Sequence, residues 1–187
     1  QEDRLQRYQR FLATEAVDAG GLGPSEVGRL RDRHVADSMM FIAGIPESAE
    51  SLADIGSGVG LPGIPIAICA PDCRVTLVDR SQRRSDLAGR AVRILGLANV
   101  EVVTSDVDDA WLADRFDIAT FRASLTIDRA ARLIAATGGG CTGLLGVSRR
   151  PEMPAIPEPP AGIRFRLTEE SKGVLDSPFW LLRMASA

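Results

Sequence analysis

The sequence predicts an α/β domain built on a mostly parallel β-sheet. From Leu52 onward, short apolar runs alternate with segments of helical periodicity. The first of these runs is followed directly by three alternating glycines, Gly56, Gly58 and Gly60. Regular alternation of this kind is typical of a parallel sheet with helices on both faces and right-handed crossovers. A chain of 187 residues with 45% apolar content is long enough to bury such a core.

Residues 1–45 are predicted to form a helical appendage to this domain. Apolar residues recur at spacings of three and four from Leu5 to Ala16, which indicates an amphipathic helix that ends at a glycine-rich stretch. We expect Ser25 to cap a second helix, which ends near Gly44. Residues 46–187 then form the main domain.

The main domain is expected to alternate strands and helices along most of its length. The strands are predicted at 51–55, 74–79, 100–104, 116–121, 140–147, 163–167 and 179–184. The helices are predicted near 62–70, 82–95, 107–113 and 125–136. Five prolines in the ten residues 151–160 exclude a helix interior, so this tract should be extended. We expect a seven-stranded sheet in which the last strand runs antiparallel.

The stretch from Asp54 to Pro65 predicts a nucleoside-binding site. Glycines at these spacings allow positive φ angles and let the backbone approach a ligand closely. Nineteen residues beyond Gly60, the predicted strand 74–79 ends in Asp79. An acidic residue at that place can accept hydrogen bonds from ribose hydroxyls. A strand before the loop, a helix after it and an acid at this distance make the pattern more specific than a glycine repeat alone.

Two classes of ligand fit this loop. The spacing of Gly58, Gly60 and Gly63 formally matches the dinucleotide fingerprint, so a nicotinamide or flavin enzyme stays an alternative. The register favours the second class, because the glycine that directly follows the strand is Gly56 and Asp54 precedes it by two residues. This is the D-x-G-x-G-x-G loop of S-adenosylmethionine-dependent methyltransferases. A closing antiparallel strand pair is also typical of the class I methyltransferase fold, which is Rossmann-like.

Composition sets expectations for location and for metal binding. The net charge of −3 gives no overall attraction to nucleic acid, although Lys172 is the only lysine among 22 basic residues. With three cysteines and with His34 as the only histidine, we expect no metal site. No apolar run approaches the roughly 20 residues of a membrane span, and the polar start does not resemble a signal peptide. We therefore expect a cytoplasmic protein that is monomeric and not bound to membranes.

Several short motifs between residues 5 and 147 match one known family. The most specific is the Leu-Pro-Gly-Ile-Pro tail of the stretch Asp54–Pro65. The supporting motifs are Arg33–Ser38, Ala70–Asp72, Val75–Asp79, Leu97–Glu101 and Phe121–Ala123. With these motifs the chain resembles the bacterial small-subunit rRNA guanine-N7 methyltransferase family, the RsmG or GidB type. The resemblance implies adenosylmethionine as cofactor, guanine N7 of 16S rRNA as methyl acceptor, and 16S rRNA or the small ribosomal subunit as partner.

The resemblance also implies which residues contact the cofactor. They are Gly56, Leu61, Val107, Asp108 and Arg122. Together with Gly58, Gly60 and Asp79, they form the predicted cofactor site at the carboxyl ends of the strands. Arg122 is in addition the candidate catalytic residue, which would hold charge on the substrate or cofactor. The alternatives are a strand-end cap for Asp79 and a structural salt bridge for Arg122.

Four residues are candidates for contact with the substrate. His34 and Asp37 lie three apart on one face of the second predicted helix, where they would shape the mouth of the cleft or orient the substrate. The alternative for His34 is a partly buried histidine with a structural role. Arg149 and Arg150 are expected to bind RNA, because Gly146 stands where the family has a lysine.

Further departures from the family pattern leave the substrate open. Asp106 replaces an arginine, and the proline tract 151–160 replaces a segment that is usually helical. Both changes leave the predicted cofactor half intact and alter the predicted RNA half. The alternatives are therefore an adenosylmethionine-dependent methyltransferase of a small molecule or another RNA, and a homologue that binds the cofactor without catalysis.

Overall fold

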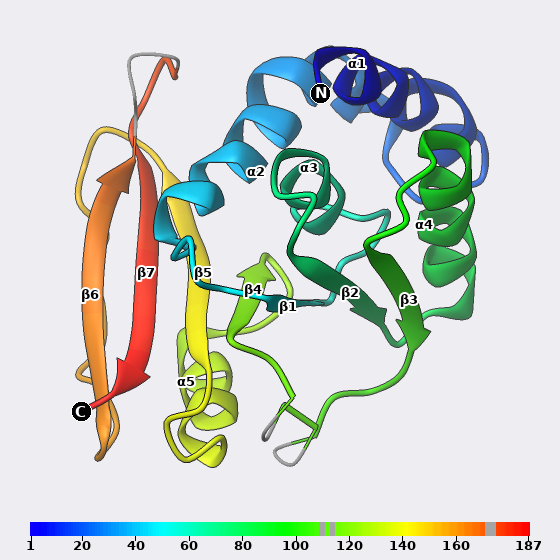
Figure 1. Cartoon of the computed structure of the whole chain (residues 1–187). Coiled ribbons are helices and arrows are strands. Elements are labelled where there is room, and N and C mark those ends of the chain that lie inside the picture. The colour runs from blue at the N-terminus through cyan, green and yellow to red at the C-terminus, as the bar shows by residue number, and fades with distance from the viewer. Residues whose placement is uncertain (109–110, 113–114, 171–174) are drawn as a thin grey trace.

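The sheet of the protein has the predicted α/β topology. The computed structural model describes residues 1–108, 111–112, 115–170 and 175–187. Within them, seven strands lie in the order β3-β2-β1-β4-β5-β7-β6 (Figure 1). Neighbouring strands pair in parallel except β7, which is antiparallel to both β5 and β6. The strands are β1 Ser51–Ile55, β2 Arg74–Asp79, β3 Val100–Thr104, β4 Ile118–Arg122, β5 Thr142–Arg149, β6 Ile163–Glu170 and β7 Phe179–Ser186.

The first three strands begin and end as predicted, whereas the last two are longer than predicted. β6 and β7 pair along their whole length, from Ile163 opposite Ser186 to Glu170 opposite Phe179. The polar end of β6, which includes Thr168 and Glu169, carries no apolar signal in the sequence. The pairing with an antiparallel partner therefore sets the length of these strands. The apolar pattern of one strand carries no information about that pairing.

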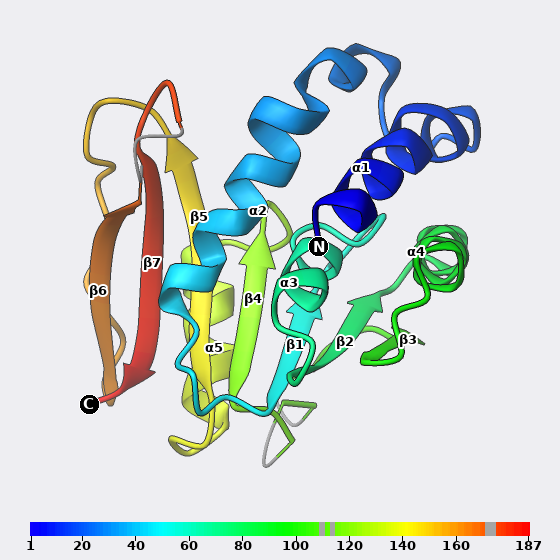
Figure 2. The ribbon, with the colours of Figure 1, turned by 45° about the horizontal axis from the view of Figure 1, so that its top comes forward.

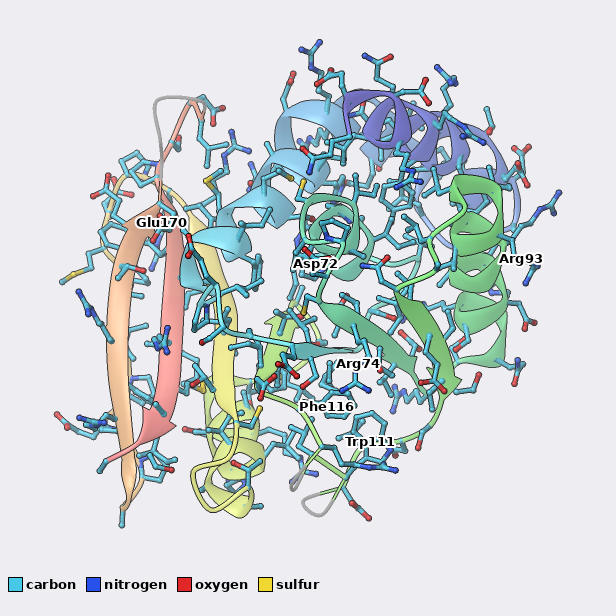
Figure 3. All side chains as sticks on the ribbon, viewed as in Figure 1. Asp72, Arg74, Arg93, Trp111, Phe116 and Glu170 are labelled. Atoms are coloured by element: carbon cyan, nitrogen blue, oxygen red, sulfur yellow. The ribbon has the colours of Figure 1, made fainter. Side chains whose placement is uncertain are left out.

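Three helices of the main domain, α3 Gly63–Cys69, α4 Gln82–Leu95 and α5 Ile127–Ala136, form close to their predicted places. The prediction of a helix at 107–113 is wrong for the residues of this segment that the structure describes, and 109–110 and 113–114 lie outside them. Here Trp111 stacks on Phe116 with ring centroids 5.4 Å apart (Figure 3), and Leu112 is fully buried. Apolar side chains on an irregular segment thus cover the sheet. The proline tract 151–160 contains neither helix nor strand, as predicted.

The N-terminal residues form two helical segments. The first is α1 Glu2–Phe11, which continues into the π-helical turn η1 Leu12–Ala16. The second runs through η2 Pro24–Arg29, η3 Leu30–Val35, α2 Ala36–Met40 and η4 Phe41–Gly44. The prediction that Ser25 caps it is wrong, because the segment begins at Pro24 and its cap position is Gly23. A proline suits the first helical position, since its φ is already helical and an N–H at this position would have no acceptor within the helix.

The two faces of the sheet are covered differently. The N-terminal segments, α3 and α4 lie on one face, and α5 lies on the other (Figure 2). Tyr8, Leu12 and Phe41 are fully buried in the same apolar cluster as Leu52 and Ile64. The predicted appendage therefore shares the core of the main domain, and a boundary at residue 45 stays a prediction. In the described part of the chain, the helices are all too short or too polar to cross a membrane.

Candidate cofactor and substrate site

The glycine-rich loop forms a tight turn between β1 and α3. Gly56, Gly58 and Gly60 have φ angles of +72°, +59° and +103°. The backbone N–H groups of Gly56 and Ser57 both donate to the carbonyl of Val78, at 2.8 and 3.0 Å, which ties the loop to the end of β2. A Cβ on Gly56 would lie 2.4 Å from Cβ of Ser124. Gly56 is thus required both for its φ and for the close approach of the turn that follows β4.

Replacing Gly56 with alanine is expected to lower the free energy of unfolding by about 2–3 kcal/mol, through left-handed strain and the clash with Ser124. The matched control is Gly58→Ala, since its φ is also positive but a Cβ there meets no atom within 4 Å. That variant should lose only about 1–2 kcal/mol. Urea unfolding of the three proteins measures both values. Equal losses for the two variants would show that close approach at Gly56 contributes nothing.

Asp54 lies beneath the loop and is completely buried. Its Oδ2 accepts a hydrogen bond from the N–H of Gly63 at 2.8 Å, and its Oδ1 accepts one from the Thr120 hydroxyl at 3.0 Å. Burial raises the pKa of Asp54 to about 7, against the opposing effect of these two hydrogen bonds. The acid that precedes the glycines therefore fixes the start of α3 to β4.

Asp79 stands at the carboxyl end of β2 and makes the strand-end cap that the sequence leaves as an alternative. One carboxylate oxygen accepts the N–H of Gly58 and the other accepts the N–H of Ser81, each at 2.9 Å. The side chain is only 4% exposed, and the Arg84 guanidinium lies 3.9 Å away. A carboxylate has about four acceptor positions, so these bonds leave capacity for a ligand. Asp79 is a strand-end cap that also borders a cavity.

Two adjoining cavities form a cleft at the carboxyl ends of β1, β2 and β4. The first, of about 300 Å³, is bordered by Asp79, by residues 105–107 and by residues 123–125. The second, of about 260 Å³, is bordered by the loop residues 56–59 and by Leu61, His34 and Arg122. Both cavities share Gly56, Arg84 and Ala123 as lining residues. Ligands of open α/β sheets bind at this edge.

Most of the predicted cofactor residues meet at this cleft. Gly56, Asp79 and Val107 border the first cavity. Gly56, Gly58, Leu61 and Arg122 border the second. Asp108 follows Val107 directly in the chain. Gly60 instead packs behind the loop, where a Cβ would lie 2.4 Å from Ile64.

The turn after β4 contributes residues that the sequence analysis missed. Ala123 has a φ of +52°, the only positive value among the non-glycine residues that the structure describes. Such strain is found where the surrounding structure enforces it, often at functional sites. In the next residue, the Ser124 hydroxyl is buried and has no hydrogen-bond partner within the described part of the chain. Because Ser124 borders the first cavity, a ligand there can supply that partner. Ala123 belongs to the motif Phe121–Ala123, but no local sequence signal marks its positive φ or the buried hydroxyl of Ser124.

Arg122 connects the end of β4 to the N-terminal helices. Its Nη1 donates to the carbonyl of His34 at 3.0 Å and to the Ser38 hydroxyl at 3.2 Å. Its Nη2 lies 3.1 Å from Nδ1 of His34 and 3.7 Å from Oδ2 of Asp37. The guanidinium is 15% exposed and still borders the second cavity. Arg122 therefore makes the structural ion pair that the sequence leaves as an alternative, at the edge of the cleft.

The contacts of His34 define its tautomer. A guanidinium can only donate, so Nδ1 accepts from Arg122 and the proton lies on Nε2. Nε2 then donates to the Glu26 carboxylate, 2.8 Å away. Burial lowers the pKa of His34, the hydrogen bond with Glu26 opposes this, and the charge of Arg122 lowers it further. His34 is thus a neutral link between Arg122 and Glu26.

Arg149 is buried, in contrast to its predicted role in binding RNA. Its side chain is 5% exposed, and its Nη1 donates to Asp37 at 3.0 Å. It also contacts the carboxylate of Asp176 and the carbonyl of Asp32. This placement weighs against a contact with phosphate, which stays a prediction for Arg149. The side chain of Arg150 is exposed, and its carbonyl accepts from the indole of Trp180.

Two departures from the family pattern have a place in the structure. A Cβ on Gly146 would lie 2.8 Å from Phe179 and 3.0 Å from Phe41, so this backbone has no room for a lysine side chain. Asp106 is exposed and borders the first cavity, where it adds negative charge. In the described residues, no group of three or more histidine, cysteine or acidic side chains is placed to hold a metal ion.

The fold and the cleft define the class of the protein. A seven-stranded sheet whose β7 is antiparallel, with a glycine loop between β1 and α3, is the class I methyltransferase fold. A SAM-dependent methyltransferase from Aquifex aeolicus has this fold, with a TM-score of 0.59 at 18% identity over 88% of this chain and 99% of that one. A mutant of MtNAS in complex with S-adenosylmethionine has a TM-score of 0.61 at 15% identity, over 98% of this chain and 72% of that one.

The sequence comparisons identify the family. The family described as rRNA small subunit methyltransferase G (GidB) matches residues 1–142, and the chain belongs to it. The ribosomal RNA small subunit methyltransferase G of Mycobacterium sp. (strain JLS) is 42% identical over 134 residues, which are 69% of this chain. The same stretch is 59% of that relative, so the chain spans less than two thirds of its length. The resemblance seen in the motifs is confirmed.

Proposed function

We propose that the chain is an S-adenosylmethionine-dependent methyltransferase that transfers a methyl group to guanine N7 of 16S rRNA. The observation that carries the proposal is the two-part cleft, because its halves suit the two ends of this cofactor. Membership of the rRNA small subunit methyltransferase G family supports the choice of rRNA as substrate. The partner is then 16S rRNA or the small ribosomal subunit. A monomeric state and a cytoplasmic location stay predictions.

The chemistry of the cleft supports an orientation for the cofactor. The first cavity combines the acceptor Asp79 with the apolar side chains of Val107 and Leu125, which suits a ribose and an adenine ring. The second cavity combines the glycine loop with the guanidinium of Arg122, which suits an amino-acid end with a carboxylate. The orphan hydroxyl of Ser124 lies at the first cavity, where it can bond a polar atom of the nucleoside.

The proposed reaction asks little of the side chains beyond positioning. When bound, adenosylmethionine supplies an electrophilic methyl group. Guanine N7 has an exposed lone pair and loses no proton on alkylation, so no strong general base is needed. This agrees with the commitment of His34 to Arg122 and Glu26. Holding the reactants in line contributes about 7–11 kcal/mol at most. Arg122 contributes by holding positive charge beside the cavity.

Transfer of labelled methyl groups tests this proposal. The protein is incubated with labelled adenosylmethionine and small ribosomal subunits from a strain that lacks the N7 methyl group. Label in 16S rRNA, released by cleavage at a methylated guanine, is the expected result. Label in another RNA or in a small molecule, and none in 16S rRNA, would contradict it in favour of the second candidate. Binding of the cofactor without transfer to any fraction would indicate a non-catalytic homologue.

Replacing Asp79 with alanine is expected to weaken the binding of S-adenosylhomocysteine by about 1–3 kcal/mol, because ribose hydroxyls and the Gly58 N–H lose their acceptor. The matched control is Asp106→Ala, which removes an exposed acid from the border of the same cavity. Calorimetry gives both affinities, and thermal unfolding verifies that both variants are folded. A loss at Asp106 equal to that at Asp79 would contradict a specific contact.

A further inference from the structure

Arginines from two distant parts of the sequence lie at the second cavity or next to residues that border it. Arg29 and Arg33 come from η2 and η3, and Arg83 and Arg84 come from the first turn of α4. Arg84 borders the cavity together with Leu22 and His34. The N-terminal segment passes over the start of α4 (Figure 1), where Nη2 of Arg83 donates to the carbonyl of Gly20 at 3.1 Å. We call Arg29, Arg33, Arg83 and Arg84 the cationic rim.

The charge of the cationic rim is only partly neutralised. Arg84 is 52% exposed and lies 3.9 Å from Asp79, and Arg29 is 64% exposed and lies 3.8 Å from Glu26. Glu26 is shared, since its other carboxylate oxygen bonds His34. Arg83 uses one of its five N–H donors on Gly20. The rim is therefore locally positive although the chain carries a net charge of −3.

Two further arginines near the cleft, Arg122 and Arg149, are paired with carboxylates. Arg122 and Arg149 are 15% and 5% exposed, and Asp37 lies between them. Asp37 offsets part of their charge, and both side chains are mostly covered by the fold. Arg80 is exposed at the first cavity, whereas the exposed positive charge beside the second cavity is that of the cationic rim.

Resting on the proposed function, we propose that the cationic rim binds the phosphates of the RNA strand that brings the target guanine to the mouth of the cleft. A guanidinium is the side chain best suited to phosphate, because its planar fork donates two parallel hydrogen bonds. Single-stranded RNA exposes the bases that proteins recognise, and its backbone on both sides of the target base carries the charge. Arg33 and Arg83, from the two sequence groups, then contact the strand, and Arg149 does not.

The salt dependence of RNA binding tests the inference. The variant Arg33→Gln/Arg83→Gln removes two charges from the rim and leaves Arg84 and Arg122 at the cleft unchanged. The matched control Arg132→Gln/Arg166→Gln removes two exposed charges from α5 and β6, of which α5 lies on the opposite sheet face. Binding to unmodified 16S rRNA, transcribed in vitro, is measured over a range of salt concentrations. Calorimetry with S-adenosylhomocysteine measures the cofactor site separately.

For the rim variant, the slope of log affinity against log salt is expected to become less negative by about 1.4, or about 0.7 for each lost phosphate contact. Its affinity for S-adenosylhomocysteine and the slope of the control should equal those of the wild type. If the wild type methylates 16S rRNA but the rim variant has an unchanged slope, the inference is overturned and the proposed function stands. An equal change in the control would also overturn it. A wild type that neither binds nor methylates 16S rRNA, free or in small ribosomal subunits, would overturn the proposed function, and the inference with it.

Discussion

Replacing Asp37 with alanine is expected to lower the free energy of unfolding by about 3–5 kcal/mol. The carboxylate is 7% exposed and lies 3.0 Å from the guanidinium of Arg149 and 3.7 Å from that of Arg122. Burial raises the pKa of Asp37, and the charges of Arg122 and Arg149 act against this. Without the carboxylate, two buried guanidinium groups face each other with no charge between them. Urea unfolding at neutral pH measures the loss.

A solvent-exposed partner of the same arginine provides the control. Asp176 also pairs with Arg149, but its side chain is 81% exposed. Asp176→Ala should therefore change the free energy of unfolding by only about 0–1 kcal/mol. A loss at Asp37 no greater than that at Asp176 would contradict a stabilising role for the buried carboxylate. Because Asp37 lies on α2 and both arginines lie at strand ends, the cluster fastens the N-terminal helices beside the cleft.

The stability of the wild type relative to Asp54→Asn is expected to fall by about 4 kcal/mol between pH 4 and pH 7. The folded pKa of Asp54 is about 7, because the group is fully buried. An unfolded aspartate has a pKa of about 3.9, so between these values the folded state holds a proton that the unfolded state has released. Stability from this group is then fully present below pH 4 and is lost as the pH rises to 7.

The asparagine variant isolates this effect from the other titrating groups. Its amide oxygen can accept from Gly63 as Oδ2 does, and its amide nitrogen, in the place of Oδ1, can donate to the oxygen of the Thr120 hydroxyl. The two proteins share every other titrating side chain, so the difference between them reports Asp54. Urea unfolding at intervals from pH 4 to pH 8 measures it. A difference that stays constant over this range would show that the folded pKa of Asp54 is not raised.

Several features of this protein follow from local rules that the sequence obeys. The first three strands begin and end where the apolar pattern places them. In β1 and most of β2 the reason is burial on both sheet faces, which demands continuous apolar runs. Gly56 and Gly58 are in the positive φ region that their spacing suggests, because only glycine adopts it without strain. The proline tract forms neither helix nor strand for an equally local reason. These signals lie within a few residues and need no knowledge of distant partners.

Other features depend on which distant segments meet. The sequence places Arg122 and Asp37 near the site, but it does not reveal that Arg149 joins them, with a side chain that is only 5% exposed. In the sequence, Asp54 is part of a cofactor motif. In the structure it is buried, and its hydrogen bonds with Gly63 and Thr120 connect the start of α3 to β4.

The sequence by itself determined the fold class and the loop, because periodicity and glycine geometry act locally, and its motifs indicated the family. The tertiary structure decided which charges are paired in the core and which stay exposed at the cationic rim. The free energy of a charge depends on its burial and on its neighbours, and both arise only when the chain has folded.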